Sequence, residues 1–405
     1  MVKYTDRVII TIILVLQKQK KQSKLLFFGY PSKSINYTGG FLWMKKVADY
    51  IEKSESHFVL KTYAQDTAKK IPHKIIGDIR NSKKAVSKCP DIAILDAWGE
   101  ANIFLWILLR LFKPKTKIIV VFHHHEERIP SCKNVLESSY NFLIQKGTSA
   151  MIRNADTILT VSQSSKEELS KIYGIDALND TIEKLGIEKN TIKTTKEIVK
   201  SLRNKIAIVG TGIDSVVFDQ ISKSRDISTL EKDIDYLCIG RIEKFYLLEK
   251  IWMAIKVVKP DANLVMVGRT SPEVAEKLRA MGIDHRGFVS EEEKIKLYQR
   301  AKVFVFPSSK EGFGIAVAEA LYNGLAVVAW KLPVFEELYQ TDKKVKIGIK
   351  LVDYGKHILF VDECLLALDL CNMEKRTDPN KKINLSLPNW QTVAQNVLNA
   401  IESVR

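Results

Sequence analysis

The chain has 405 residues, which is enough for two domains of ordinary size, each with its own core. Hydrophobic residues make up 46% of it, while Gly and Pro occupy only 19 and 11 positions, a composition that excludes a disordered or fibrous protein. The five cysteines are odd in number and form no Cys-x-x-Cys pair. This pattern argues against a disulfide framework or a zinc site and favours a reducing compartment, the cytoplasm.

The net charge of +16 is concentrated in two segments. Residues 1–24 carry a net charge of +5, and residues 183–205 carry +4. Such localised charge indicates contact with an anionic surface, either lipid head groups or nucleic acid. No aromatic-basic platform or nucleic-acid motif accompanies the charge, so nucleic acid is the less favoured partner.

The first of these segments contains an apolar run at residues 8–16. Nine residues are too few to cross a bilayer as a helix, which takes about 20. A signal peptide would be followed by small residues at a cleavage site, whereas polar and basic residues follow here. Three interpretations stay open: an additional β-strand, which the Val, Ile and Thr content favours, a shallow membrane anchor, or sequence upstream of the true start.

Short apolar runs alternate with helical patterns over the first half of the chain. Strands are predicted at residues 24–31, 92–95, 117–122, 157–161 and 206–209. The first helix is predicted at 41–53, directly after Gly39 and Gly40. Strands that alternate with helices in this way indicate a parallel, doubly wound sheet.

A basic segment separates the last two of these strands. Its cations fall at steps of three and four residues, which places them on one face of a helix: Lys189, Lys193, Lys196, Lys200 and Arg203. A basic amphipathic helix of this kind can lie on an anionic bilayer. The competing interpretation is a solvated charged face above a narrow apolar stripe, and both stay open.

The strand and helix pattern restarts after a polar stretch at residues 220–233. Strands are predicted at 236–241, 263–267 and 303–306, a short strand and turn at 286–290, and helices at 248–258, 292–300 and 315–322. An amphipathic helix is predicted at 390–404. Because ligands of open α/β sheets bind beyond the carboxyl ends of the strands, two such sheets place a binding site in the cleft between them.

The most informative motif spans residues 307–324. It contains two carboxylates, Glu311 and Glu319, separated by seven residues. Gly312 and Gly314 lie where a strand feeds a helix, and the unpaired N–H groups at such a junction favour a phosphate. Glu319 lies inside the helix among small residues, where a carboxylate needs a partner. The hydroxyl groups of a ribose or hexose would serve as that partner.

This motif resembles the signature of the retaining glycosyltransferases of family 4, the glycosyl transferases group 1. The resemblance extends through most of the chain and implies the GT-B fold, in which two Rossmann-like, doubly wound α/β domains face each other across a cleft. It divides the chain into an N-terminal extension at 1–24, an acceptor-side domain at 25–219 with a basic insertion at about 176–205, a linker at 220–233, a nucleotide-sugar-binding domain at 234–387, and a helix at 388–405 that returns to the first domain.

The resemblance also assigns residues to the donor. The donor-binding residues that it implies are Gly39, Gly40, Arg241, Lys244, Phe288, Val289, Gly312, Phe313, Gly314, Ile315 and Glu319. Gly39 and Gly40 would let a backbone N–H approach the diphosphate, and Arg241 at a strand tip would bind it by charge-assisted hydrogen bonds. The chain departs from the family at Tyr246-Leu247, where a Lys-Gly pair is usual. Lys244 or Lys250 would then replace that lysine.

The segment from His123 to Glu127 follows the strand that ends at Phe122. Consecutive residues of a strand alternate in direction and no His-x-x-x-His spacing occurs, so a metal site is not favoured. In the family that the chain resembles, a single histidine ends this strand near the transferred bond, and His123 matches it best. Asp233-Ile-Asp235 is interpreted as a polar lead-in to a strand, and the reaction is expected to need no metal or other cofactor.

Together these features predict a retaining hexosyltransferase. It would transfer a sugar from a UDP- or GDP-sugar donor to a glycan or lipid-linked acceptor, in the cytoplasm or peripherally at the inner face of the membrane. The resemblance implies that Glu311 holds hydroxyls of the donor sugar, that Glu319 holds the ribose, and that His123 stabilises the sugar in the transition state. Two alternatives stay open: an enzyme similar to the non-hydrolysing sugar-nucleotide epimerases, and a weakened paralogue that binds nucleotide sugar or membranes.

Overall fold

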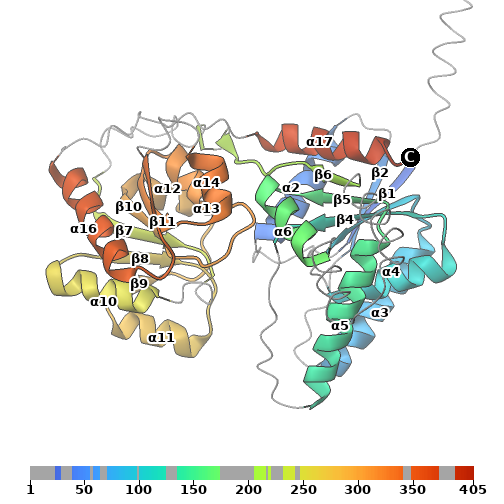
Figure 1. The fold of residues 1–405 in the computed structure, drawn as a ribbon, viewed down its shortest axis with the longest axis horizontal. Helices are drawn as coiled ribbons and strands as arrows, with labels where there is room; N and C mark the ends of the chain where they lie inside the picture. The colour runs from blue at the N-terminus through green and yellow to red at the C-terminus, as the bar shows by residue number, and fades with distance from the viewer. Residues whose placement is uncertain are drawn as a thin grey trace, which may run out of the picture.

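The computed structural model describes twelve stretches of the chain: residues 23–28, 39–54, 58–63, 71–97, 100–124, 135–173, 205–215, 218–219, 231–241, 247–340, 348–373 and 388–405. The N-terminal extension before Ser23, the basic segment 183–204, most of the predicted linker and Lys244 lie outside these residues. The described residues form two α/β domains, each built on a six-stranded parallel sheet with helices on its faces (Figure 1).

The first domain alternates strands and helices throughout. Its elements are β1 (Ser23–Phe28), α2 (Gly39–Lys53), β2 (Phe58–Tyr63), α3 (Ile71–Ser87), β3 (Ile92–Asp96), α4 (Glu100–Phe112), β4 (Lys117–Phe122), α5 (Val135–Arg153), β5 (Thr157–Thr160), α6 (Gln163–Tyr173) and β6 (Ile206–Ile208). The strand order is β2-β1-β3-β4-β5-β6. The five predicted strands are confirmed to within a few residues. The prediction missed β2, an edge strand whose apolar run is interrupted by Lys61 and Thr62.

Alternate residues of the central strands pack on opposite sides of the first sheet. On one side, Ile92 and Ile94 of β3 belong to the same cluster as Trp43 of α2. On the other side, Ala93 and Leu95 belong to a separate cluster. Because helices cover both faces, β3 is buried along its whole length, as in other parallel sheets.

The second domain repeats the pattern. Its elements are β7 (Ile234–Ile239), α10 (Leu248–Val258), β8 (Leu264–Val267), α11 (Pro272–Ala280), β9 (Ile283–His285), α12 (Glu291–Arg300), β10 (Ala301–Phe306), α13 (Ile315–Tyr322), β11 (Ala326–Trp330), α14 (Pro333–Tyr339), β12 (Ile349–Val352) and α16 (His357–Met373). The strand order is β12-β11-β10-β7-β8-β9. The helices predicted at 248–258 and 315–322 have the predicted bounds.

The short strand predicted at 286–290 is wrong by a few residues. The strand is β9, which ends at His285, and residues 286–290 form the connection to α12. Gly287 has a φ of +64°, which a strand does not accommodate, and Ser290 caps α12 by accepting a hydrogen bond from the Glu293 N–H.

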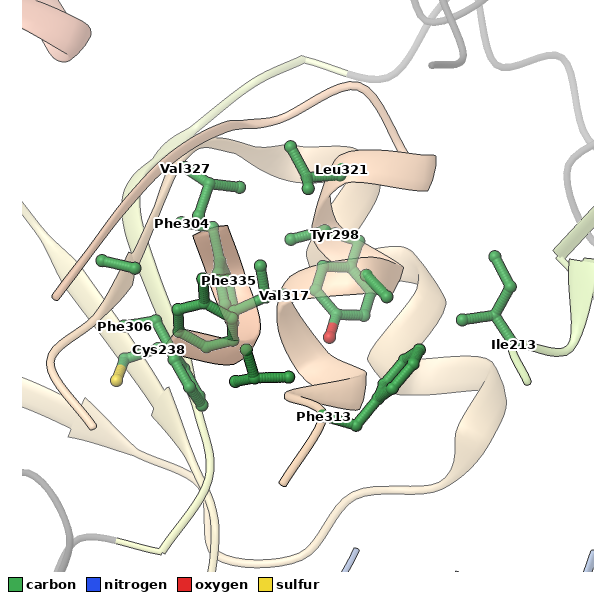
Figure 2. Packing of buried hydrophobic residues seen from close by; sticks show 14 of the residues in the cluster. Ile213, Cys238, Tyr298, Phe304, Phe306, Phe313, Val317, Leu321, Val327 and Phe335 are labelled. Atoms are coloured by element: carbon green, nitrogen blue, oxygen red, sulfur yellow. The ribbon is translucent and has the colours of Figure 1, made fainter. Parts of the chain in front are cut away.

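An aromatic cluster fills the space between the second sheet and helices α12 to α14 (Figure 2). The rings of Phe304 and Phe306 stack with their centroids 5.8 Å apart. Phe335 of α14 lies 6.1 Å from Phe306, and Tyr298 of α12 lies 5.8 Å from Phe304. Because Phe306 is the last residue of β10, its packing in this cluster fixes the end of the strand from which the turn before α13 begins.

The last helix, α17 (Trp390–Glu402), packs along α2 of the first domain (Figure 1). Asn389 caps it by accepting a hydrogen bond from Thr392 N, and it also pairs with Ile213 in an isolated parallel bridge. Asn396 donates a hydrogen bond to the Val209 carbonyl oxygen at 3.2 Å. The end of the chain is therefore held on the first domain, after the second domain has been completed.

None of the helices among the described residues combines the length and the apolar character needed to cross a membrane.

Substituting Gly212 with alanine tests the packing of α17. A Cβ atom at this position would lie 2.6 Å from the backbone nitrogen of Trp390. Backbone atoms cannot rotate away, so the free energy of unfolding is expected to fall by about 1–3 kcal/mol in urea titrations. Gly39→Ala is the control, since a Cβ atom there meets no atom within 4 Å. Equal stability of the two variants would contradict the close approach.

Candidate functional site

Three of the predicted donor segments follow strand ends at the carboxyl edge of the second sheet. Arg241 follows β7, residues 286–290 follow the edge strand β9, and Glu311 follows β10. Strands β7 and β10 are hydrogen-bonded neighbours, with Leu237 paired to Phe304. The ends of parallel strands meet at one edge of a sheet, where ligands of such sheets bind.

Glycine determines the shape of the turn between β10 and α13. Gly314 is the N-cap of α13, adopts a left-handed φ of +79°, and offers no side chain to accept a hydrogen bond from the first turn of the helix. A Cβ atom there would lie 2.4 Å from the Phe335 ring. Phe313 is buried beside it. Glycine is therefore required at this position by both backbone conformation and packing, and its lack of a side chain means that the N-cap residue accepts no hydrogen bond from the first turn of α13.

Glu311 lies at the start of this turn and is half-buried. Its Oε1 atom accepts a hydrogen bond of 2.7 Å from the Ser308 hydroxyl, which orients the carboxylate. Ser308 is itself buried and follows β10 by two residues. The carboxylate is thus held beside the N-terminus of α13.

His123 is buried where β4 ends, with 8% of its surface exposed. Its Nε2 atom lies 3.7 Å from Oδ2 of Asp96, and its ring meets Trp43 edge-on at 5.6 Å. A Cβ atom on Gly40 would lie 3.0 Å from the His123 Cδ2 atom. The glycine at the start of α2 therefore leaves room for the histidine, and the two predicted residues are in contact.

The same histidine meets the second domain through its backbone. A Cβ atom on Gly312 would lie 2.2 Å from the His123 carbonyl oxygen. The hydroxyl of Ser165 donates to this oxygen at 2.5 Å, and the hydroxyl of Ser162 donates to the Gly312 carbonyl oxygen at 2.9 Å. The structure thus brings Gly40, His123 and Gly312 together across the two domains.

A second contact between the domains lies beside the first. The Glu337 carboxylate of α14 accepts hydrogen bonds from the backbone nitrogens of Gln163 at 2.9 Å and Ser164 at 2.7 Å, and so caps α6 of the first domain. Lys310 pairs with Glu168 of α6 at 3.0 Å. Sequence reasoning missed Ser162, Ser165 and Glu337, because no local pattern relates residues about 150 positions apart.

The carboxylate of Glu319 accepts hydrogen bonds from two side chains of the protein. Its Oε1 atom accepts a hydrogen bond from Lys294 Nζ at 2.8 Å, and its Oε2 atom accepts one from the Tyr298 hydroxyl at 3.0 Å. Only 5% of the residue is exposed. Burial raises the pKa of the Glu319 carboxyl above its ordinary value, and the Lys294 ammonium and Tyr298 hydroxyl oppose this shift. The sequence analysis expected a partner for this carboxylate and named sugar hydroxyls, but it did not identify Lys294 and Tyr298, which serve as partners within the protein.

The remaining predicted residues line the same edge of the second sheet. Arg241 is half-buried at the end of β7. Phe288 is 40% exposed, and Val289 packs against the core. Ile315 is the first residue of α13. The proposed substitute Lys250 is exposed on α10, while Lys244 lies outside the described residues.

The Asp-x-Asp pair lies at the opposite end of the sheet, at the start of β7. Asp233 pairs with Arg300, and Asp235 pairs with Lys302 at 2.8 Å. The Arg300 guanidinium holds the pKa of Asp233 below its ordinary value. Across the stretches that the structure describes, no group of three or more His, Cys, Asp and Glu side chains is arranged to hold a metal ion.

Removing the carboxylate of Glu337 tests the contact between the domains. Glu337→Ala leaves two backbone N–H groups of α6 without their charged acceptor, which is worth about 1–3 kcal/mol. The domains are then expected to separate more often, which raises the radius of gyration in small-angle scattering. The neighbouring variant Glu336→Ala is the control, since Glu336 pairs with Lys331 inside its own domain. An unchanged radius in Glu337→Ala would show that this contact does not hold the domains together.

Comparisons with known proteins agree with this architecture. Residues 219–382 match the family model of glycosyl transferases group 1. The chain is 26% identical over 268 residues to the O-antigen chain mannosyltransferase RfbU of Salmonella typhimurium, covering 58% of this chain and 62% of that protein. It is 24% identical over 200 residues to the serotype-specific mannosyltransferase WbdA of Escherichia coli, covering 47% and 22%. The chain thus spans less than two thirds of either relative.

Solved structures show the fold. A sucrose-phosphate synthase from Thermosynechococcus elongatus superposes with a TM-score of 0.61 at 13% identity, covering 94% of both chains. Anabaena Alr3699/HepE, solved with UDP and glucose, superposes with a TM-score of 0.59 at 12% identity, covering 94% of this chain and all of that one. The protein therefore has the GT-B fold, and the part of the chain that is similar to glycosyl transferases group 1 is residues 219–382.

Proposed function

We propose that this protein is a glycosyltransferase that moves a sugar from a nucleotide-sugar donor to a glycan acceptor. The single observation that carries the proposal is the contact of Gly312 with His123, which joins the anion-binding turn of the second domain to a buried histidine of the first. A bound donor would have its diphosphate on one side of this contact and its sugar on the other. RfbU and WbdA are named as mannosyltransferases, which supports mannose as the transferred sugar.

The donor diphosphate would bind at the carboxyl edge of the second sheet. The N-terminus of α13 offers N–H groups at Gly314 and beyond, and Arg241 offers charge-assisted hydrogen bonds. Gly39 and Gly40 at the start of α2 would let a backbone N–H approach from the first domain. These groups supply the positive potential that a metal ion supplies in other enzymes, so we propose a metal-independent reaction.

The sugar would lie between Glu311 and His123. Glu311, oriented by Ser308, would accept hydrogen bonds from sugar hydroxyls, and His123 would stabilise the sugar as the bond to the diphosphate breaks. Among the described residues, none stands out as a covalent nucleophile. We therefore propose retention of configuration by a front-face route, as in family 4, in which the leaving diphosphate accepts the proton of the acceptor hydroxyl.

Replacing the two motif carboxylates separates their roles. Glu311→Ala is expected to lower kcat by about 100-fold or more, because a group that holds the reacting sugar is lost. Glu319→Ala is expected to raise KM for the donor about 10-fold or more with a smaller effect on kcat. The measurement is turnover with GDP-mannose or UDP-glucose, whichever raises the melting temperature of the protein more.

Asp362→Ala, an exposed carboxylate of α16, is the control for both variants. Wild-type turnover in both motif variants would overturn the assignment. Conversion of the donor without any acceptor would instead identify an activity like that of the sugar-nucleotide epimerases. Donor binding with no product of either kind would indicate a binding paralogue.

We further propose that the enzyme works peripherally at the inner face of the membrane, through residues 1–24 and 183–205. The support is their net charge of +5 and +4. Reversing the charge of Lys193, Lys196 and Lys200 is expected to release the protein from anionic liposomes, by about 1 kcal/mol for each removed cation. Sedimentation with neutral liposomes is the control. Unchanged binding to anionic liposomes would remove this segment from the role.

A further inference from the structure

Helix α12 presents three polar side chains to the buried carboxylate of Glu319. Glu291, Lys294 and Tyr298 follow one another at steps of three and four residues, so they lie on one face of the helix. Lys294 Nζ lies 2.8 Å from Glu319 Oε1 and 3.0 Å from Glu291 Oε2. The Tyr298 hydroxyl lies 3.0 Å from Glu319 Oε2. The ammonium is therefore shared between one buried and one exposed carboxylate.

Lys294 keeps its positive charge in this network, and this charge favours the ionised form of the buried Glu319 carboxyl. Burial by itself lowers the pKa of Lys294, but the carboxylates of Glu319 and Glu291 more than reverse this effect and raise the pKa above its ordinary value. The carboxyl of Glu319 carries the opposite penalty, because burial favours its neutral form. Without the ammonium, only the hydroxyl of Tyr298 would oppose protonation of Glu319.

The geometry also leaves Glu319 able to accept more hydrogen bonds. A carboxylate has about four lone-pair positions on its two oxygens. Lys294 takes one position on Oε1, and Tyr298 takes one on Oε2. With respect to the described residues, each oxygen therefore retains an acceptor position, and two such positions match the two adjacent hydroxyls of a ribose.

We propose that Lys294 is a positioning residue, which holds the carboxylate of Glu319 in place as a charged acceptor for the vicinal hydroxyls of the donor ribose. This inference rests on the proposed function and extends it to a residue outside the two-glutamate motif. Lys294 does not touch the reacting bond, so its loss is expected to affect donor affinity far more than kcat.

Few titratable groups in the described part of the chain surround Glu319, so few groups other than Glu319 itself affect how its protonation changes with pH. Lys294, Glu291 and Tyr298, all on α12, are the charged or titratable groups that act on it among the described residues. The strands β10 and β11, on which α13 also packs, contribute the buried apolar residues Phe304 and Val327 on this side of the sheet (Figure 2). Cys238 of β7 acts on Tyr298, and burial raises the pKa of its thiol.

The test is the affinity of Lys294→Met for GDP and UDP between pH 5 and pH 8, measured by calorimetry. Methionine keeps the length and apolar stem of lysine but removes the cation. For the nucleotide that the wild-type protein binds better, we expect affinity to fall about 10- to 100-fold at pH 5 and to recover as pH rises. Lys296→Met is the matched control, since Lys296 lies on the same helix and pairs with Glu292 on the surface.

The stability of Lys294→Met is expected to change with pH in the opposite direction to its nucleotide affinity. A carboxyl whose folded pKa is raised stabilises the fold while it is protonated, and this contribution is lost as pH rises through the raised value. The variant should therefore have a higher melting temperature at pH 5 than at pH 8, while its nucleotide affinity is higher at pH 8. A purely structural role for Lys294 would not produce these opposite trends.

Two further variants keep the test decisive if Lys294→Met folds poorly. Lys294→Arg retains the charge and is expected to keep the wild-type pH profile of affinity. Lys294→Met combined with Glu319→Gln removes the carboxyl, so the ratio of its affinity to that of the wild-type protein should change little between pH 5 and pH 8, whereas the ratio for Lys294→Met alone should rise with pH. The 2′-deoxy forms of GDP and UDP report on the ribose, and their loss of affinity relative to the parent nucleotide should shrink in Lys294→Met.

The outcomes distinguish failure of the proposed role of Lys294 from failure of the proposed glycosyltransferase function. A wild-type affinity and pH profile in Lys294→Met, with nucleotide binding intact, would overturn the role of Lys294 and leave the proposed function standing. An equal loss of 2′-deoxy discrimination in Lys296→Met would overturn it as well. Absence of binding of any nucleotide to the wild-type protein would overturn the proposed function, and the inference with it.

Discussion

The contact between Gly312 and the carbonyl oxygen of His123 is the constraint on which the rest of the site depends. A Cβ atom at Gly312 would lie 2.2 Å from that oxygen, so any side chain would push the two domains apart. The contact sets the turn before α13 against the end of β4, and the hydroxyls of Ser162 and Ser165 fix the two carbonyl oxygens that meet there. One small residue thus decides whether the turn before α13 can lie against the buried histidine at the end of β4.

The two domains are joined by elements of different kinds. Helix α17 returns to the first domain and packs on α2 through an apolar face that includes the buried Trp390. Glu337 caps α6 across the domain boundary, where its charge complements the positive end of the helix. Apolar packing excludes water and resists separation, whereas an exposed polar cap can open at modest cost. A domain pair held in this way can separate at the polar contact while the packing of α17 keeps the domains connected.

The buried carboxylate of Glu319 in the second domain is stabilised by an ion pair and a hydrogen bond. Glu319 is placed at the centre of a short helix of small residues, and its ion pair with Lys294 makes that position tolerable. Tyr298 contributes its hydroxyl to the same carboxylate and its ring to the aromatic cluster beneath (Figure 2). The network around Glu319 and the hydrophobic core therefore share a residue, which couples the position of α12 to that of α13.

The sequence by itself determined the elements and the motif. The apolar periodicity located eight of the twelve strands that the structure describes, the bounds of α10 and α13, and the glycines at the ends of α13, because these depend on local spacing and backbone conformation. It missed β2, β11 and β12 and misplaced β9. Three of these, β2, β9 and β12, are edge strands, whereas β11 lies inside the second sheet. A short apolar run such as that of β11 cannot be told from a helical segment by periodicity alone. Only the tertiary structure decided that Lys294 pairs with Glu319, that Ser162 meets Gly312, and that Glu337 caps α6. Such contacts join residues from separate elements, and their existence depends on how the sheets and helices pack, which no local pattern encodes.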